Sequence, residues 1–259
     1  MESASHKQLI QQEFTRQAEA FAASPSISDP DRLRRLVEAV NPDPAASVLD
    51  VACGPGYLAL AFAERCRRVV GVDLTPAPLA IAEQMRRERG LENVTFQIDD
   101  ADNLSFADGK FDVVVSRFAI HHMQTPASII KEFVRVCRRG GKVAIEDLLS
   151  SEHPARSAYQ NEFERLRDPS HVRALPLTEL VGIMTAAGLE ITSIYTGSLT
   201  PSLERWLANA QTPPAEATKV REMIERDLAE DLSGARPFRQ DGQVYFHQLT
   251  AAVIARKLL

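Results

Sequence analysis

The chain has 259 residues, a length that suits one α/β domain with an elaboration. Hydrophobic residues make up 44% and charged residues 25%, a balance typical of a globular protein and not of a disordered one. The formal net charge of -5 gives no support to nucleic-acid binding, which favours a basic surface.

The chain begins with the pattern of an amphipathic helix at residues 6–23, whose apolar face carries Phe14 and Phe21. One interpretation packs this helix on the core. The other makes it a lid over the mouth of a ligand site, which would bring Phe14 or Phe21 near the ligand. A Pro/Ser linker at residues 24–30 and a second helix at residues 31–40 follow.

The stretch from Ser47 to Gly56, Ser-Val-Leu-Asp-Val-Ala-Cys-Gly-Pro-Gly, predicts a buried strand that runs into a glycine turn. Gly54 and Gly56 allow a sharp bend and a close approach of the backbone to a ligand. A helix predicted at residues 57–68 completes a cradle for a nucleotide-like ligand. The spacing also satisfies the dinucleotide pattern G-x-G-x-x-G/A, so an NAD(P)-dependent oxidoreductase stays open.

Asp50, at the carboxyl end of this strand, favours a cationic ligand over a pyrophosphate. It would suit the sulfonium and amino group of S-adenosylmethionine (SAM). Here the sequence resembles the class I SAM-dependent methyltransferases, whose first motif ends a strand with an acid and continues with G-x-G. Ala52 replaces the usual first glycine, and we expect it to adopt an ordinary backbone conformation. The resemblance implies cofactor contacts from Asp50, Ala52, Cys53 and the two glycines, and from Phe14.

A second strand predicted at residues 69–74 ends at Asp73. A carboxylate at this place can accept hydrogen bonds from both ribose hydroxyls of a nucleotide. It can also cap the helix predicted at residues 76–90, and both roles can hold together. We expect Asp73 and its neighbour Leu74 at the cofactor.

The third predicted strand, residues 94–98, is followed by Asp99-Asp100-Ala101. The family often has Gly-Asp-Ala at this position, where the acid accepts a hydrogen bond from the adenine amino group. The resemblance therefore implies that Asp100 and Ala101 bind the adenine. A solvated acidic turn is the alternative.

The fourth predicted strand ends at Ser116 and continues into Arg117 and a pair of histidines, His121 and His122. The run from Leu104 to this pair closely resembles the UbiE-like methyltransferases of ubiquinone and menaquinone biosynthesis (type 11). The resemblance implies that Ser116 and Arg117 lie at the cofactor. Either histidine could act as a base, because histidine titrates near neutrality; the alternative is that the pair holds the loop. Adjacent histidines lack the spaced ligand set of a zinc site, so we expect no metal.

A polar loop at residues 167–173 follows a helix predicted at residues 154–167 and contains Arg167, His171 and Arg173. An ion-pair network would explain it. The alternative is a loop that faces the acceptor, with His171 as a third candidate base. The remaining predicted elements are a helix at 128–137, strands at 142–148, 190–195 and 242–256, and helices at 177–187, 201–210 and 214–232.

These elements predict an α/β fold with seven strands and interleaved helices. The resemblance implies a Rossmann-like methyltransferase sheet in the order 3-2-1-4-5-7-6, its last strand antiparallel, with helices on both faces and a small helical cap. We expect one domain over residues 1–259. It comprises a helical lid at 1–40, a SAM-binding core at 41–150, and cap insertions at 151–176 and 201–242.

The function implied is methyl transfer from SAM to carbon or oxygen of a small-molecule acceptor by direct displacement, which relies mainly on alignment of the reactants. The alternatives are an NAD(P)-dependent oxidoreductase, or a SAM-binding protein that does not methylate. The sequence does not identify the acceptor.

Three cysteines, an odd number without C-x-x-C spacing, make a disulfide framework unexpected and fit a reducing cytoplasm. No stretch approaches the roughly 18 apolar residues of a membrane-spanning helix, and no signal peptide is visible. We therefore expect a cytoplasmic protein with no nucleic-acid or membrane partner. A homodimer stays open.

Overall fold

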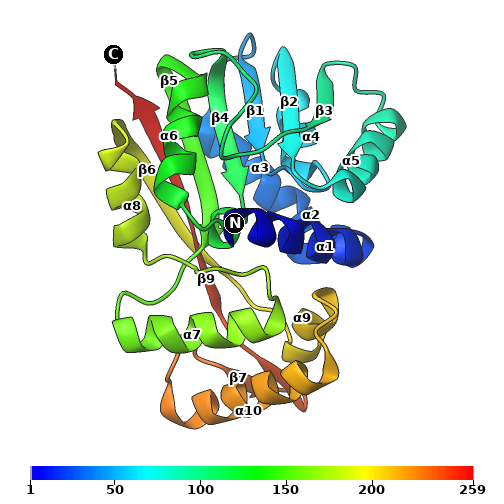
Figure 1. The fold of residues 1–259 in the computed structure, drawn as a ribbon, viewed down its shortest axis with the longest axis vertical. Coiled ribbons are helices and arrows are strands. Elements are labelled where there is room, and N and C mark those ends of the chain that lie inside the picture. Colours follow the sequence, from blue (N-terminus) through cyan, green and yellow to red (C-terminus); the bar gives the residue numbers. More distant parts are fainter. Residues whose placement is uncertain (1, 259) are drawn as a thin grey trace.

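The computed structural model describes residues 2–258, with side chains from Ser5 onward. A sheet of seven strands in the order β3-β2-β1-β4-β5-β9-β6 dominates the fold (Figure 1). Its strands are β1 (Ser47–Val51), β2 (Arg68–Asp73), β3 (Val94–Ile98), β4 (Phe111–Arg117), β5 (Cys137–Leu148), β6 (Leu189–Leu199) and β9 (Gln248–Lys257).

The first five strands of this sheet are parallel, and β9 runs antiparallel to both β5 and β6. Because β9 is the last strand in the chain and lies between β5 and β6, the predicted order and the antiparallel last strand are confirmed. The helices are α1 (Glu2–Ala22), α2 (Pro25–Ser28), α3 (Pro30–Val40), α4 (Tyr57–Ala63), α5 (Pro76–Glu88), the 3-10 turn η1 (Ile120–His122), α6 (Pro126–Val136), α7 (Pro154–Arg167), α8 (Leu177–Ala186), α9 (Leu203–Asn209) and α10 (Pro214–Glu230).

Helices cover both faces of the sheet, which explains the nearly unbroken apolar sequence of its central strands. Side chains alternate along each strand. Val48 and Val115 therefore pack with α3 and α4 on one face, whereas Leu49 and Val114 pack with α6 on the other. This alternation also determines which polar residues at the strand ends share a face. Asp50 points to the same face as Val48, because the two are two residues apart.

The predicted boundaries of β9 and β5 are wrong. The final strand was expected at residues 242–256, but a separate hairpin precedes it, formed by β7 (Phe238–Gln240) and β8 (Gln243–Tyr245). Asp241 and Gly242 make its two-residue turn, both with positive φ, as a tight hairpin requires. Strand β5 begins at Cys137, earlier than the predicted residue 142.

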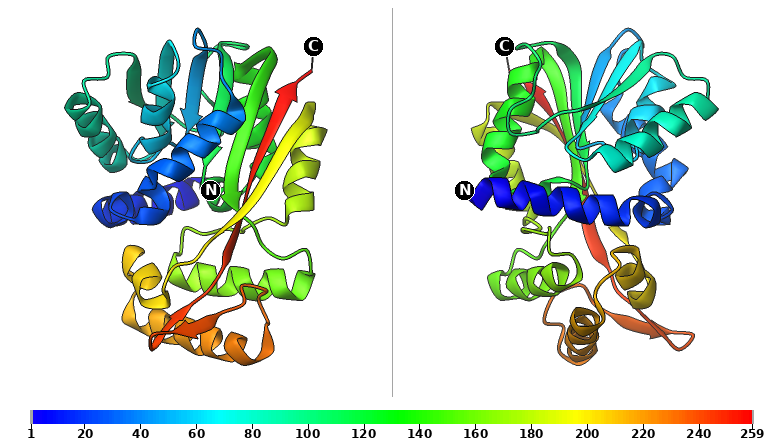
Figure 2. Two further views of the ribbon diagram at one scale, coloured as in Figure 1. Left: turned by 180° about the vertical axis from the view of Figure 1, so that it is seen from behind. Right: turned by 45° about the vertical axis from the view of Figure 1, so that its right-hand side comes forward.

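A smaller apolar cluster holds α7, α9, α10 and the hairpin together. Its centre is aromatic: Phe163, Trp206 and Phe246 meet edge to face, with centroids 4.9 to 6.3 Å apart. This group, which we call the cap, lies beyond the carboxyl ends of the strands (Figure 1). Helix α1 crosses between the sheet and the cap (Figure 2). No helix in the described part of the chain is long and apolar enough to cross a membrane.

Candidate functional site

A cavity opens at the carboxyl ends of β1, β2 and β4, which is where parallel α/β sheets bind ligands. Helix α1 forms its outer wall, and Phe14 and Phe21 face into it. Most of the predicted cofactor residues line this cavity. They are Phe14, Asp50, Ala52, Cys53, Gly54, Asp73, Leu74, Asp100, Ala101 and Arg117.

The two glycines of the turn have different roles. A Cβ on Gly54 would approach only the ring of Phe21, at 3.8 Å across the cavity. A Cβ on Gly56 would instead lie 2.7 Å from Ala82 and 2.8 Å from Phe96. Gly56 is not among the residues that line the cavity, although we had expected it at the cofactor. Gly54 therefore leaves room for a ligand, whereas Gly56 lets α4 pack against β3 and α5.

Ala52 departs from its prediction. We expected an ordinary backbone conformation, but its φ is 56°, in the left-handed region that favours glycine. A non-glycine residue in this region carries roughly 1–2 kcal/mol of strain.

Asp73 ties the end of β2 to the glycine turn. Its Oδ2 accepts a hydrogen bond from Gly54 N at 2.8 Å, and its Oδ1 accepts one from Thr75 N at 2.9 Å, just before α5. Burial raises the pKa of this carboxyl, and the N–H groups of Thr75 and Gly54 oppose that rise. Asp73 thus lines the cavity and holds Thr75, the residue before α5, but it is not the N-cap that the alternative expected, because Thr75 occupies that position.

Asp50 and Arg117 place opposite charges on one side of the cavity. Asp50 Oδ2 is buried and has no hydrogen-bond partner among the described residues. Burial raises the pKa of Asp50 to about 7, although Arg117 and the N–H of Ala59 oppose it. Arg117 donates from Nη2 to the carbonyl of Ile27, but its buried Nη1 lacks a partner within residues 2–258.

Buried polar atoms are nearly always hydrogen-bonded, so these two call for a ligand that fits both. One is an acceptor and the other a donor. The amino-acid end of SAM carries an ammonium and a carboxylate, which match Asp50 and Arg117 respectively. The residues present therefore fit this cofactor.

The predicted adenine site is bordered by α1. Lys7 donates to Asp100 Oδ2 at 2.7 Å and also pairs with Asp102. Farther along the helix, Gln11 donates to the carbonyl of Leu74 at 3.0 Å. The N-terminal half of α1 thus spans the rim from β2 to the loop after β3, which is consistent with the lid interpretation.

The two adjacent histidines differ sharply. His122 lines the cavity, and burial together with the neighbouring His121 lowers its pKa to about 4. His121 lies behind it, with ring centroids 4.2 Å apart, and donates from Nδ1 to Asp147 at 2.5 Å. Burial alone would lower the pKa of His121, but Asp147 outweighs it and the net shift is upward. His122 is therefore neutral, and His121 is the histidine that holds a proton more firmly.

Besides Gly56 and His121, two further predicted site residues do not line the cavity. His171 is 4% exposed, bonds through Nε2 to Asn161 Oδ1 at 2.8 Å and is not among the residues that line the cavity. Its loop is mostly tied down by packing and ion pairs: Arg167 stacks on Trp206 and Arg173 pairs with Glu179. Ser116 is 1% exposed and points to the α6 face, because alternation along β4 sends Arg117 to the other face.

Several lining residues had no signal in the sequence. Phe118 has a φ of 54°, which turns the chain sharply after β4, and its ring forms part of the wall. His6 of α1 bonds to the carbonyl of His122 at 2.9 Å. Ile27 supplies the carbonyl for Arg117. These contacts depend on how α1 and α2 cross the sheet, which local sequence patterns do not specify.

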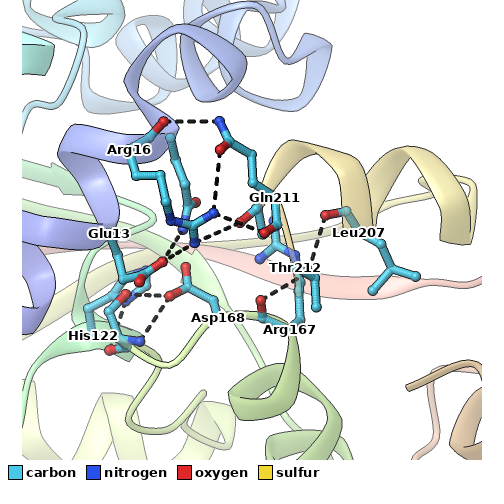
Figure 3. A network of polar contacts seen from close by, with 11 residues as sticks. Glu13, Arg16, His122, Arg167, Asp168, Leu207, Gln211 and Thr212 are labelled. Carbon is cyan, nitrogen blue, oxygen red and sulfur yellow. Dashed lines mark hydrogen bonds and ion pairs between the residues drawn. The ribbon is translucent and has the colours of Figure 1, made fainter. Parts of the chain in front are cut away.

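Polar contacts also join α1 to the cap. Arg16 donates to the carbonyl of Gln211 at 2.9 Å, and the side chain of Gln211 donates back to the carbonyl of Arg16 at 3.0 Å (Figure 3). Thr212, the next residue, donates to the carbonyl of Arg167 at the end of α7. The outer wall of the cavity is thus attached to the cap and to the loop behind His122.

Comparisons with known proteins agree with this geometry. A family profile described as a methyltransferase domain matches residues 49–145. YcgJ, an uncharacterized methyltransferase of Bacillus subtilis, is 30% identical over 200 residues, which cover 77% of this chain and 79% of that protein. The chain belongs to the class I SAM-dependent methyltransferases of type 11.

This methyltransferase also matches the crystal structure of a putative methyltransferase from Bacillus halodurans, with a TM-score of 0.83 and 29% identity. The match covers 88% of this chain and all of the other. A ubiquinone biosynthesis O-methyltransferase of Pseudomonas paraeruginosa is 36% identical over 102 residues, which cover 39% of this chain and 44% of that protein. SAM is therefore the methyl donor of this enzyme, and the oxidoreductase alternative is excluded.

Proposed function

We propose that this methyltransferase transfers the SAM methyl group to a hydroxyl oxygen of an apolar small molecule, such as a phenol or quinol. The observation that carries the proposal is the composition of the wall around His122. Ile10, Phe14, Phe118 and Met123 line the cavity together with His122, and the polar Gln124 and Thr125 follow Met123 in the lining. An acceptor that is apolar except for one hydroxyl matches this wall.

His122 is suited to take the hydroxyl proton. Its Nδ1 is occupied by Ser170, while its Nε2 has no hydrogen-bond partner in the described part of the chain. Because its pKa is lowered, the ring is neutral at physiological pH and can accept a hydrogen bond from the hydroxyl. We assign His121 no contact with the acceptor, since it lies behind His122.

The residues that line the cavity suggest where each part of the cofactor binds. In this proposal Asp73 holds the ribose, Asp100 and Ala101 border the adenine, and Asp50 and Arg117 hold the amino-acid end. When bound, SAM supplies a methyl group on a positively charged sulfur, which is a good electrophile. His122 removes the acceptor proton as the oxygen–carbon bond forms and the carbon–sulfur bond breaks. The apolar wall keeps water from the reacting oxygen.

A relative offers separate support. The Pseudomonas paraeruginosa protein that matches the core of this chain is an O-methyltransferase of ubiquinone biosynthesis. Its match covers less than half of that protein, so the support extends to the kind of acceptor atom and not to the compound.

The test is a turnover screen with SAM over phenols, quinols and keto acids, in which formation of S-adenosylhomocysteine and of a methylated product are both measured. We expect activity with phenols or quinols. His122→Asn keeps a donor near the position of Nδ1 and removes Nε2, so it should lower kcat at least tenfold with little change in SAM affinity. Turnover restricted to keto acids, or full activity of His122→Asn, would contradict the proposal.

A further inference from the structure

Behind His122 lies a buried polar chain that the function above does not use. Ser170 is fully buried, and its Oγ donates to Asp168 Oδ1 at 2.6 Å. The backbone N–H of Ser170 donates to the same oxygen at 2.9 Å. On its other side, Ser170 meets His122 Nδ1 twice, at 3.1 Å through its carbonyl oxygen and at 3.1 Å through its Oγ.

These contacts determine the tautomer of His122. The carbonyl oxygen of Ser170 can only accept, so His122 Nδ1 must carry the proton that it shares with Ser170. The Ser170 hydroxyl proton points to Asp168, which turns an oxygen lone pair toward the same Nδ1–H. In the neutral ring, Nε2 is then the nitrogen with the free lone pair, and it belongs to the side chain that lines the cavity.

We propose that Asp168 is a positioning residue for methyl transfer, which acts through Ser170 to hold His122 in the tautomer with Nε2 free for the acceptor hydroxyl. This inference rests on the proposed function in one respect, the role of His122 as the proton acceptor. Asp168 itself touches neither substrate. Its charge lies where it can stabilise the imidazolium that forms when His122 takes a proton.

The titratable groups around His122 support an anionic Asp168 beside a neutral His122. The groups that face His122 are His121 in the same turn, Asp147 behind His121, Asp168 and His171 after α7, and His6 of α1. Burial would raise the pKa of Asp168, but His122, Arg167 and the two donations from Ser170 outweigh it and lower that pKa. Asp168 is thus an anion in the resting protein. Only Ser170 separates it from the imidazole ring of His122, which must become charged.

The cap contains a matched control. Asp227, inside α10, accepts hydrogen bonds from the N–H and the Oγ of Ser233, the same two kinds of donor that Ser170 offers Asp168, but six residues along the chain instead of two. Asp227 is also 1% exposed, and it is not among the residues that line the cavity. Replacing either aspartate with asparagine therefore changes one buried carboxyl that accepts two hydrogen bonds from a serine, and only Ser170 of the two serines contacts a histidine.

The first measurement needs no acceptor. Nitrogen NMR shifts of His122 in the full-length protein report which ring nitrogen carries the proton. We expect the Nδ1–H form to dominate in the wild type and in Asp227→Asn, and to lose part of its population in Ser170→Ala, which removes the Oγ acceptor and leaves only the carbonyl. Asp168→Asn should lower the midpoint of the His122 titration, because a neighbouring anion is lost. Unchanged shifts and midpoint in both variants would overturn the proposal.

The second measurement is the rate with an acceptor from the turnover screen. Asp168→Asn should lower kcat at least tenfold while the dissociation constant of SAM changes less than twofold; Asp227→Asn should retain kcat. Equal loss in both variants would show a structural role only and overturn the proposal. If Asp168→Asn does not fold, Ser170→Ala decides by the same criteria. Because the NMR result does not depend on an acceptor, a wrong acceptor class would leave it intact.

Discussion

The carboxylate of Asp50 and the guanidinium of Arg117 line the same cavity, and each keeps one buried atom without a hydrogen-bond partner among residues 2–258. They come from neighbouring parallel strands, β1 and β4, and lie on the same face of the sheet. An acceptor and a donor in this arrangement match the two ends of an amino acid. The structure thus explains the acid of the first motif, Asp50. It also identifies Arg117, which lies outside that motif, as the second group suited to the amino-acid end of SAM.

Asp50 should make SAM affinity depend on pH. Burial raises its pKa to about 7 in the protein without ligand, so it is largely protonated at lower pH and cannot attract an ammonium. Binding must then release a proton, and affinity should fall about tenfold for each pH unit between roughly pH 7 and pH 5. Titration calorimetry in two buffers of different ionisation enthalpy measures both effects. Asp50→Asn should bind more weakly and without this slope; a slope that persists in the variant would assign it to another group.

Arg117→Met should weaken SAM binding by about 1.5–3 kcal/mol, the range for a hydrogen bond to a charged group. The reason is that the buried Nη1 would lose the carboxylate that we assign to it. 5′-Methylthioadenosine lacks the amino-acid end and supplies the control, since its affinity should change less than twofold. Equal losses of affinity for both ligands would mean that Arg117 shapes the cavity and does not bind the carboxylate of SAM.

Gly54 and Gly56 should respond differently to substitution. Gly54→Val places a side chain in the cavity near Phe21, so SAM binding should be lost; the φ of 52° also strains a residue with a Cβ, so part of the stability is lost as well. Gly56→Ala would set a methyl group against Ala82 and Phe96, and we expect a loss of stability of about 1–3 kcal/mol from overpacking and strain. Thermal unfolding and SAM titration of the pair separate the two effects. Normal SAM binding by Gly54→Val would place the cofactor elsewhere.

Ala52→Gly should stabilise the protein. Its left-handed φ carries strain that glycine would relieve, and the added freedom of glycine in the unfolded chain offsets part of the gain. We expect the free energy of unfolding to rise by about 0.5–1 kcal/mol in denaturant titrations, with SAM affinity unchanged. A lower stability would mean that the methyl group of Ala52 makes contacts that outweigh the strain.

The sequence predicted the sheet well because its information is local and periodic. Val48, Leu49 and Val51 identify a strand buried on both faces, and the resemblance supplied the strand order. The glycine turn and its flanking acids lie within a short stretch, and they line one cavity as expected. The exceptions have local causes: Ser116 falls in the wrong phase of β4, and Gly56 is needed for packing.

The acceptor side was predicted poorly because tertiary packing decides it. The sequence placed His171 in a polar loop that could face the acceptor. In the structure His171 is buried and bonds to Asn161 of α7, a helix of the cap. Ser170, which contacts His122, and Asp168, which bonds to Ser170, are 48 and 46 residues away from His122 in the chain, and no pattern links them. The path of α1 across the cavity is equally non-local. These are the parts in which structures with one core diverge.

The most direct test of the central claim follows the methyl group itself. SAM with an isotopically labelled methyl would be incubated with the wild-type enzyme and a phenol or quinol found in the turnover screen. We predict that the label appears on the acceptor oxygen, with one S-adenosylhomocysteine formed for each product, and that Asp50→Asn and His122→Asn both reduce the yield. SAM that binds in the cavity but never transfers its label to any acceptor would contradict the account.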